Sequence, residues 1–280
     1  MCRNNRGNSK MCIIEEENLS EAWAKTFIMS CNIKGKCLSP LIVCVNKFDE
    51  DNNPYENSDI VELLGEFHER EKKTANKNYI HTVANTIFPY NFWLRSETRE
   101  EFYSKYLKIL DKLRSIRLNN YGLYFERMIS YHSGNNEINQ IEKLIDCWCK
   151  VYKSSKYHRR PYRRFMQISI VDPNIDLGIN SRSRNFPCLH QIALDYDIND
   201  KFGINIIAYY PTQYLFQRAY GNYLGLARLG RFFAYELGNE CIGQSYRLNK
   251  LTCIIGRALV ESGTPRELSG SLQNILNKGE

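Results

Sequence analysis

The sequence lacks a long apolar run, and this excludes one large class of protein. No apolar segment of the 280 residues approaches the length of about 18 residues that a membrane-spanning helix needs. Residues 1–10 are polar and lack the apolar core of a secretory signal, so we expect no signal peptide and a cytoplasmic protein. Apolar residues make up 43% of the chain and charged residues 25%, which excludes a wholly disordered or fibrous chain.

Common motifs of nucleotide-binding proteins and hydrolases are also missing. The sequence has no Walker A loop, no Gly-x-Gly-x-x-Gly segment after a strand and no Gly-x-Ser-x-Gly elbow. Its ten cysteines include no Cys-x-x-Cys pair and its five histidines are scattered, so we expect no zinc or other metal site. The even number of cysteines is compatible with disulfides, but a chain of this length without a secretion signal favours reduced thiols.

The sequence has an excess of positive charge. The net charge is +7, and basic residues gather between Lys150 and Arg164, where Tyr152, Tyr157 and Tyr162 alternate with them. Basic and aromatic residues in alternation are typical of proteins that bind single-stranded nucleic acid, but a phosphorylated small molecule also needs cations. A solvated basic face is the simplest interpretation, and the composition leaves all three open.

Apolar periodicity predicts one α+β domain over residues 18–262, after a loose arm over residues 1–17 and before a polar tail over residues 263–280. The predicted helices are Asn18–Met29, Ile60–Glu69, Glu97–Arg117, Ile138–Val151, Tyr214–Leu237 and Ser245–Glu261. The predicted strands are Pro40–Asn46, Phe165–Val171, Leu189–Tyr196 and Gly203–Tyr210. The short polar turn between the last two strands indicates a hairpin.

Cys188 is the most promising nucleophile. It follows Pro187 at the start of a predicted strand, downstream of the arginine-rich segment. Nearby guanidinium groups lower the pKa of a thiol and so favour the reactive thiolate. The alternative is that Cys188 is one of ten cysteines and only packs in the core.

Three features together resemble thymidylate synthase and the related pyrimidine-nucleotide hydroxymethylases. Arg163 and Arg164 run directly into a strand, as the family's arginine pair does. Pro187-Cys188 follows about two dozen residues later, like the family's Pro-Cys-His loop, although Leu189 stands in place of the histidine. The hairpin and a long helix then come in the family's order. The resemblance covers about residues 120–240, and Gly122 to Tyr124 resembles the start of a further family segment.

The resemblance implies a thymidylate-synthase-like α+β fold, with a mixed or antiparallel sheet flanked by helices and a sheet face at a homodimer interface. It implies an enzyme in which the Cys188 thiolate adds to C6 of a pyrimidine nucleotide, so that C5 accepts a one-carbon unit from 5,10-methylenetetrahydrofolate. Arg163 and Arg164 would reach across the dimer to the partner's phosphate site, with Tyr124 lining the pocket.

The family's phosphate arginine and its base-reading asparagine can be aligned in two registers. Matching letters makes Arg218 the phosphate arginine and puts Gly221 at the family's folate-binding aspartate and Leu229 at its asparagine. Matching the hairpin glycine and the helix end instead makes Asn222 the base reader, with Gln213 at the strand end. We prefer the second register, because the first needs a strand of 16 residues and strands usually run about 3–10.

Several family features have no counterpart, which argues against an ordinary thymidylate synthase. The segment that holds the ribose and the glutamate that assists proton transfer are not recognisable, and the C-terminal tail does not resemble the family's hydrophobic one. A second hypothesis is therefore a nucleotide-binding or interaction module without turnover, in a regulatory or phage-defence system. A third is a basic nucleic-acid-binding protein, whose binding would depend strongly on salt.

Overall fold

A mixed β-sheet forms the centre of the molecule. The computed structural model describes residues 11–278, except 71–79, 117–118, 120–121, 135, 155, 157–158, 178–185, 242 and 244. The sheet order is β1 (Cys12–Glu16), β3 (Leu41–Val45), β9 (Arg247–Leu259), β8 (Gly203–Tyr214), β7 (Gln191–Tyr196) and β6 (Gln167–Ser169), and β2 (Cys37–Leu38) also pairs with β9. The pairs β1–β3 and β8–β9 are parallel and the others antiparallel. The expected mixed sheet flanked by helices is confirmed, as is the hairpin of β7 and β8.

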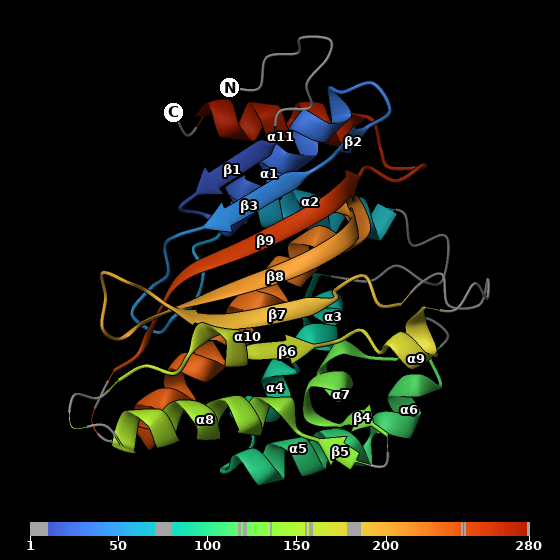
Figure 1. Ribbon diagram of the computed structural model, residues 1–280. Coiled ribbons are helices and arrows are strands. Elements are labelled where there is room, and N and C mark those ends of the chain that lie inside the picture. Colours follow the sequence, from blue (N-terminus) through green and yellow to red (C-terminus); the bar gives the residue numbers. More distant parts are fainter. Residues whose placement is uncertain are drawn as a thin grey trace.

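Helices cover one face of this sheet (Figure 1). The central helix is α10 (Tyr220–Glu240), which packs on β8 and β9, while α1 (Leu19–Cys31) packs on β1 and β3. Asn18 caps α1 by accepting hydrogen bonds from the backbone N–H groups of Ser20 and Glu21. The other helices of this layer are α2 (Ser58–Arg70), α3 (Ile80–Ile87) and α11 (Glu267–Lys278).

A smaller helical region lies beyond β6 (Figure 1). Its helices are α4 (Tyr90–Leu94), α5 (Arg99–Lys108), α6 (Leu110–Arg114), α7 (Tyr124–Ile129), α8 (Gln140–Ser154) and α9 (Pro173–Asp176). The remaining elements are the hairpin of β4 (Tyr131–Ser133) and β5 (Asn136–Ile138) and the 3₁₀ turn η3 (Arg163–Phe165). Buried rings of Phe88, Phe102, Phe125 and Phe232 join this region to α10.

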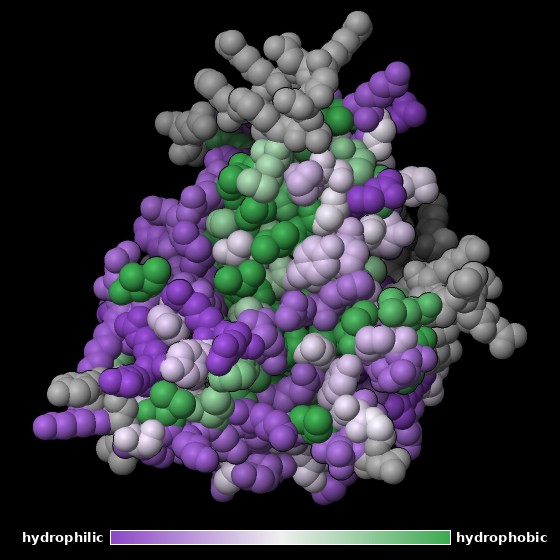
Figure 2. Space-filling model, in the orientation of Figure 1, coloured by the Kyte–Doolittle hydropathy of each residue, from purple (hydrophilic) through white to green (hydrophobic). Residues whose placement is uncertain are grey.

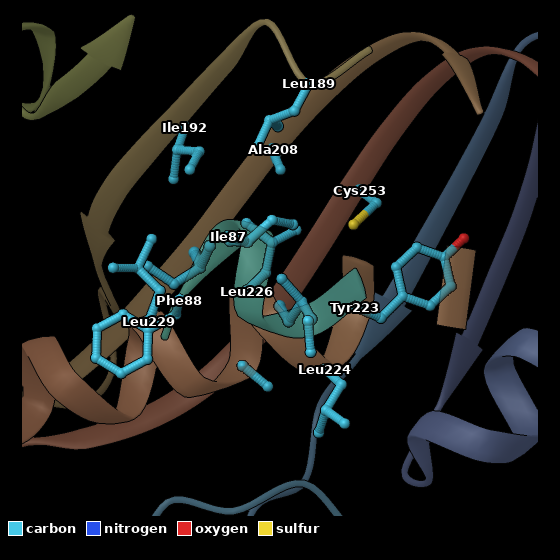
Figure 3. Packing of buried hydrophobic residues seen from close by; sticks show 14 of the residues in the cluster. Ile87, Phe88, Leu189, Ile192, Ala208, Tyr223, Leu224, Leu226, Leu229 and Cys253 are labelled. Atoms are coloured by element: carbon cyan, nitrogen blue, oxygen red, sulfur yellow. The ribbon is translucent and has the colours of Figure 1, made fainter. Parts of the chain in front are cut away.

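Helix α3 packs unusually close to α10. A Cβ added to Gly221 would lie 2.5 Å from Cβ of Val83, and one added to Gly225 would lie 2.7 Å from the backbone oxygen of Ala84. The two glycines therefore let the helix backbones approach each other. Figure 3 shows Leu226 of α10 beside Ile87 of α3, with strand residues such as Ala208 on the other side.

The opposite face of the sheet carries apolar side chains that the helices do not cover. Ile13, Ile42, Ile254 and Tyr209 lie next to each other across four strands, and three of them are exposed, at 55% for Ile13, 39% for Ile254 and 42% for Tyr209. We call these four residues the open sheet face. Figure 2 shows an apolar band running along the sheet on the side turned toward the viewer.

The structure differs from the sequence predictions in several segments. The predicted helix Ser245–Glu261 is wrong, because this segment forms strand β9, whose Leu251, Cys253 and Ile255 alternate toward the core. The expected loose arm over residues 1–17 contains β1, and its residues 1–10 lie outside the described residues. The polar tail contains α11, which buries Leu268 and Leu272. Within the described ranges, no helix is both long and apolar enough to cross a membrane.

Candidate active site

Cys188 lies just before β7, in a loop held by aromatic contacts. The backbone N–H of Cys188 donates to the hydroxyl of Tyr124 over 3.3 Å, and the ring of Tyr124 stacks on Phe186 with 5.1 Å between centroids. Gly122 has a φ of +127°, and a Cβ there would lie 2.8 Å from the Phe186 ring. Only glycine suits this position, so the segment from Gly122 to Tyr124 fixes the half-buried thiol in place.

Among the described residues, Arg218 is the charged group that shifts the pKa of this thiol. The arginine belongs to η5 (Leu215–Ala219), a single π-helical turn between β8 and α10. Burial raises the pKa of the Cys188 thiol, and the guanidinium of Arg218 lowers it by a smaller amount. The sequence suggests a thiol activated by several guanidinium groups. In the part of the chain that the structure describes, Arg218 alone acts on this thiol, and the raised pKa keeps the thiol mainly protonated at neutral pH.

Tyr124 keeps its proton at neutral pH. Burial, and to a smaller extent the neighbouring Cys188, raise the pKa of the Tyr124 hydroxyl to about 12. Tyr124 can therefore donate a hydrogen bond from its O–H while it accepts one from the backbone N–H of Cys188.

Two buried polar groups beside this site have no hydrogen-bond partner among the described residues. They are the hydroxyl of Tyr210 and the side-chain nitrogen of Gln213, both on the inward face of β8. The Gln213 oxygen accepts a hydrogen bond of 3.0 Å from the hydroxyl of Tyr223. Tyr210 also interacts electrostatically with Tyr124 and Cys188. Because unpaired buried polar groups are rare and costly, these two suggest that a bound ligand completes them.

The two alignment registers select different candidate residues. Gln213 is 1% exposed and Asn222, in the first turn of α10, is 3% exposed, so both residues of the geometric register are buried polar groups. Arg218, which belongs to the letter register, is the residue whose charge reaches Cys188. Leu229, which the letter register puts in place of the asparagine, is completely buried in the apolar core.

Arg163 and Arg164 lie far from Cys188 of the same chain. The guanidinium of Arg163 pairs with the carboxylate of Asp195 and lies 4.3 Å from the ring centroid of Tyr196. Arg164 lies over Phe165, with its guanidinium 4.8 Å from the ring centroid. Asp195 lies near the end of β7 and Cys188 precedes its start, and the seven residue steps between them correspond to about 20 Å of extended chain. Neither arginine can therefore meet the thiol within one chain.

A cavity of about 280 Å³ adjoins this site, with Arg218 in its wall. It is bounded by Thr82, Asn85, Thr86, Pro89, Asn91, Phe92, Tyr106, Ile109, Leu113, Ile116, Asn119, Leu123 and Arg218. Most of these side chains are apolar, so the cavity suits a flat or aliphatic group whose anionic part faces Arg218.

Glu261 is a functional candidate that the sequence does not reveal. Its carboxylate accepts hydrogen bonds of 3.0 Å from the backbone N–H of Phe216 and 2.9 Å from that of Gln217, and so holds the turn that carries Arg218. Burial raises the pKa of this carboxyl group, and the charge of Arg218 opposes the shift. The sequence puts Glu261 at the end of a predicted helix, so no local signal links it to Arg218.

The residues do not fit the folate cofactor in the family's manner. The letter register puts Gly221 where the family has its folate-binding aspartate, and a side chain there would collide with Val83. For metals, no group of three or more potential ligands occurs in the part of the chain that the structure describes.

No protein-family model matches the sequence, and no curated protein matches it either. The function therefore has to be argued from the site itself.

Proposed function

We propose that this chain is a divergent thymidylate-synthase-like enzyme that acts at C5 of a pyrimidine nucleotide, with Cys188 as its nucleophile. The observation that carries the proposal is the meeting of Cys188, Tyr124 and Arg218 at the junction of the β7 loop, α7 and η5. A thiol and an arginine close together suit a substrate that has an electrophilic ring and an anionic group.

In the proposed reaction, the Cys188 thiol loses its proton and the sulfur bonds to C6 of the pyrimidine ring. The electron pair of the C5–C6 double bond then resides at C5, conjugated with the C4 carbonyl or imine, and C5 takes up a proton or a one-carbon electrophile. Arg218 lowers the pKa of the thiol and so raises the fraction of thiolate. Loss of the original C5 hydrogen and elimination of the sulfur restore the double bond.

The unpaired groups of β8 support a heterocyclic substrate. A pyrimidine edge presents a carbonyl acceptor beside a ring nitrogen. The free N–H of Gln213 can donate to such an acceptor, and the hydroxyl of Tyr210 can donate or accept. We assign Asn222 to the same edge, because it is a buried amide on the adjacent turn of α10.

The proposal includes a homodimer that joins two open sheet faces. Exposed apolar side chains on a sheet call for a partner surface, since isolated proteins rarely expose large apolar patches. In such a dimer, Arg163 and Arg164 would serve the partner's phosphate site, which agrees with their distance from Cys188 of their own chain.

The identity of the one-carbon donor rests on the resemblance alone. The resemblance implies 5,10-methylenetetrahydrofolate, but the close packing at Gly221 excludes the family's folate contact there. The proposed activity is therefore the addition of sulfur at C6 and the exchange of hydrogen at C5.

A nucleotide-binding module without turnover is the second candidate, because burial raises the pKa of the Cys188 thiol. Ligand binding tests the nucleotide site in both candidates, by unfolding temperatures measured with a panel of pyrimidine and purine mononucleotides. A ligand at about a hundredfold its Kd stabilises the fold by about 2.7 kcal/mol, which raises the unfolding temperature by several degrees.

We expect one class of pyrimidine mononucleotide to stabilise the wild type but not Arg218→Gln. Arg247→Gln is the control, because this arginine pairs with Asp200 beside the start of β8, at the other end of the strand from Arg218. Equal responses to purines and pyrimidines, or no response to any nucleotide, would reject a pyrimidine site.

A further inference from the structure

Two buried cysteines from different helices face each other at the end of α10. The sulfur atoms of Cys149, in α8, and Cys241, which follows the last residue of α10, are 3.7 Å apart. The two residues are 92 positions apart in the sequence, and both are reduced. They lie in the helical layer and take no part in the site around Cys188.

The surroundings make Cys241 the more acidic thiol. Hydrogen bonds from the Cys149 thiol and from the Tyr246 hydroxyl stabilise a Cys241 thiolate, and Lys153 adds a positive charge. Together they lower the pKa of Cys241 to about 7, although burial and Glu240 act in the opposite direction. The Cys149 thiol, as the donor, has a raised pKa. Cys241 is thus the more acidic thiol of the pair, and its sulfur lies in contact with that of Cys149.

A cavity borders the residues that flank Cys241. Glu240, Gly243 and Tyr246, the described residues flanking Cys241 in sequence or contact, line an open cavity of about 1120 Å³. A small molecule in this cavity lies against the residues that flank Cys241, and the cysteine itself is 1% exposed.

We propose that Cys149 and Cys241 form a reversible dithiol–disulfide site that responds to a peroxide. A disulfide between them needs the sulfur atoms to close from 3.7 Å to about 2.05 Å, which side-chain rotation and a small backbone shift supply. The bond links α8 to the end of α10, and reduction by a dithiol releases it.

With hydrogen peroxide as the oxidant, the chemistry balances in two steps. The Cys241 thiolate attacks one peroxide oxygen, the O–O bond breaks, and the departing hydroxide takes a proton to become water. The sulfur of Cys149 then attacks the sulfenic acid of Cys241, the S–S bond forms and the S–O bond breaks. This second hydroxide takes the thiol proton. Two thiols lose two electrons and two protons in total, and peroxide becomes two water molecules.

Peptide mapping tests this proposal on the intact protein. After treatment with peroxide and alkylation of the remaining thiols, a tryptic digest without reductant should contain residues 144–150 linked to residues 232–247. The first peptide holds both Cys147 and Cys149, so Cys147→Ser is the matched control and should keep the link. Cys149→Ser and Cys241→Ser should each abolish it.

The unfolding temperature provides a second readout. Peroxide should raise it in the wild type and in Cys147→Ser, dithiothreitol should reverse the rise, and neither cysteine variant of the pair should respond. If peroxide oxidises other thiols of the wild type while this link stays absent, the proposal is overturned. Retention of the link in Cys149→Ser would overturn it as well. If Cys149→Ser or Cys241→Ser fails to fold, Cys147→Ser still decides the question, because its peptide 144–150 keeps Cys149 alone.

Discussion

At the scale of single residues, the site is defined by polar groups whose neighbours lie far away in the sequence. Tyr210 and Gln213 look like ordinary strand residues, and only the fold shows that they are buried with unpaired atoms near Cys188. The sequence predicts Cys188 as a candidate because a Pro-Cys step at a strand start is a local signal. The sequence alone cannot show that Arg218, and not Arg163 or Arg164, lies near Cys188, because this depends on which strand ends lie together in the fold.

Removal of the Tyr210 hydroxyl should have opposite effects on stability and on nucleotide binding. Tyr210→Phe removes a buried group that has no partner among the described residues, so the free energy of unfolding should rise by about 1 kcal/mol. The same change should weaken nucleotide binding. Tyr223→Phe is the matched control: it removes the hydrogen bond to Gln213 and should lower stability by about 1 kcal/mol. Urea unfolding measures both, and a loss of stability in Tyr210→Phe would show that the hydroxyl has a partner.

At the scale of elements, the sequence predicts helices and strands well where the apolar residues follow either the helical or the strand period clearly. Helices α1, α2 and α8 and the β7–β8 hairpin follow their predicted segments within a few residues. The sequence prediction misses strand β9. The apolar residues between Leu251 and Leu259 are compatible with either a buried strand or a helix. Its pairing with both β3 and β8 decides the outcome, and no local pattern encodes that pairing.

The close packing of α3 against α10 predicts that Gly225 cannot be replaced. Gly225→Ala puts a Cβ 2.7 Å from the backbone oxygen of Ala84, so the helices must separate. Stability should fall by about 1–3 kcal/mol, in spite of the better helix propensity of alanine. Gly270→Ala in α11 is the control, because a Cβ there meets nothing within 4 Å. It should raise stability by about 0.5–1 kcal/mol. Equal effects of the two changes in urea unfolding would contradict this packing.

At the scale of the whole molecule, the open sheet face is the feature that a single chain leaves unexplained. The chain carries a net charge of +7 and covers one side of its sheet with helices, yet the other side presents isoleucines and tyrosine. The sequence of a single strand does not predict this patch. The patch arises because the register of four neighbouring strands brings their outward apolar side chains together.

We therefore expect a dimer of twice 32.9 kDa in solution, measured by sedimentation at micromolar concentration. Ile254→Glu puts a charge at the centre of the open sheet face and should shift the mass toward the monomer. Leu94→Glu, at the end of α4 and 57% exposed, should leave the dimer intact. A monomeric wild type, or a dimer that Ile254→Glu does not weaken, would contradict a sheet-mediated dimer.

Exchange of the C5 hydrogen of a pyrimidine nucleotide with solvent, measured without folate, is the most direct test of Cys188 as the nucleophile. Exchange needs only the addition of the Cys188 sulfur to C6. Because burial raises the pKa of this thiol, the exchange rate should continue to rise with pH beyond the range in which an ordinary thiol ionises. Cys188→Ala should abolish exchange, and Cys147→Ala should leave it unchanged. Absence of exchange from every uracil and cytosine nucleotide, or exchange that survives in Cys188→Ala, would contradict the account.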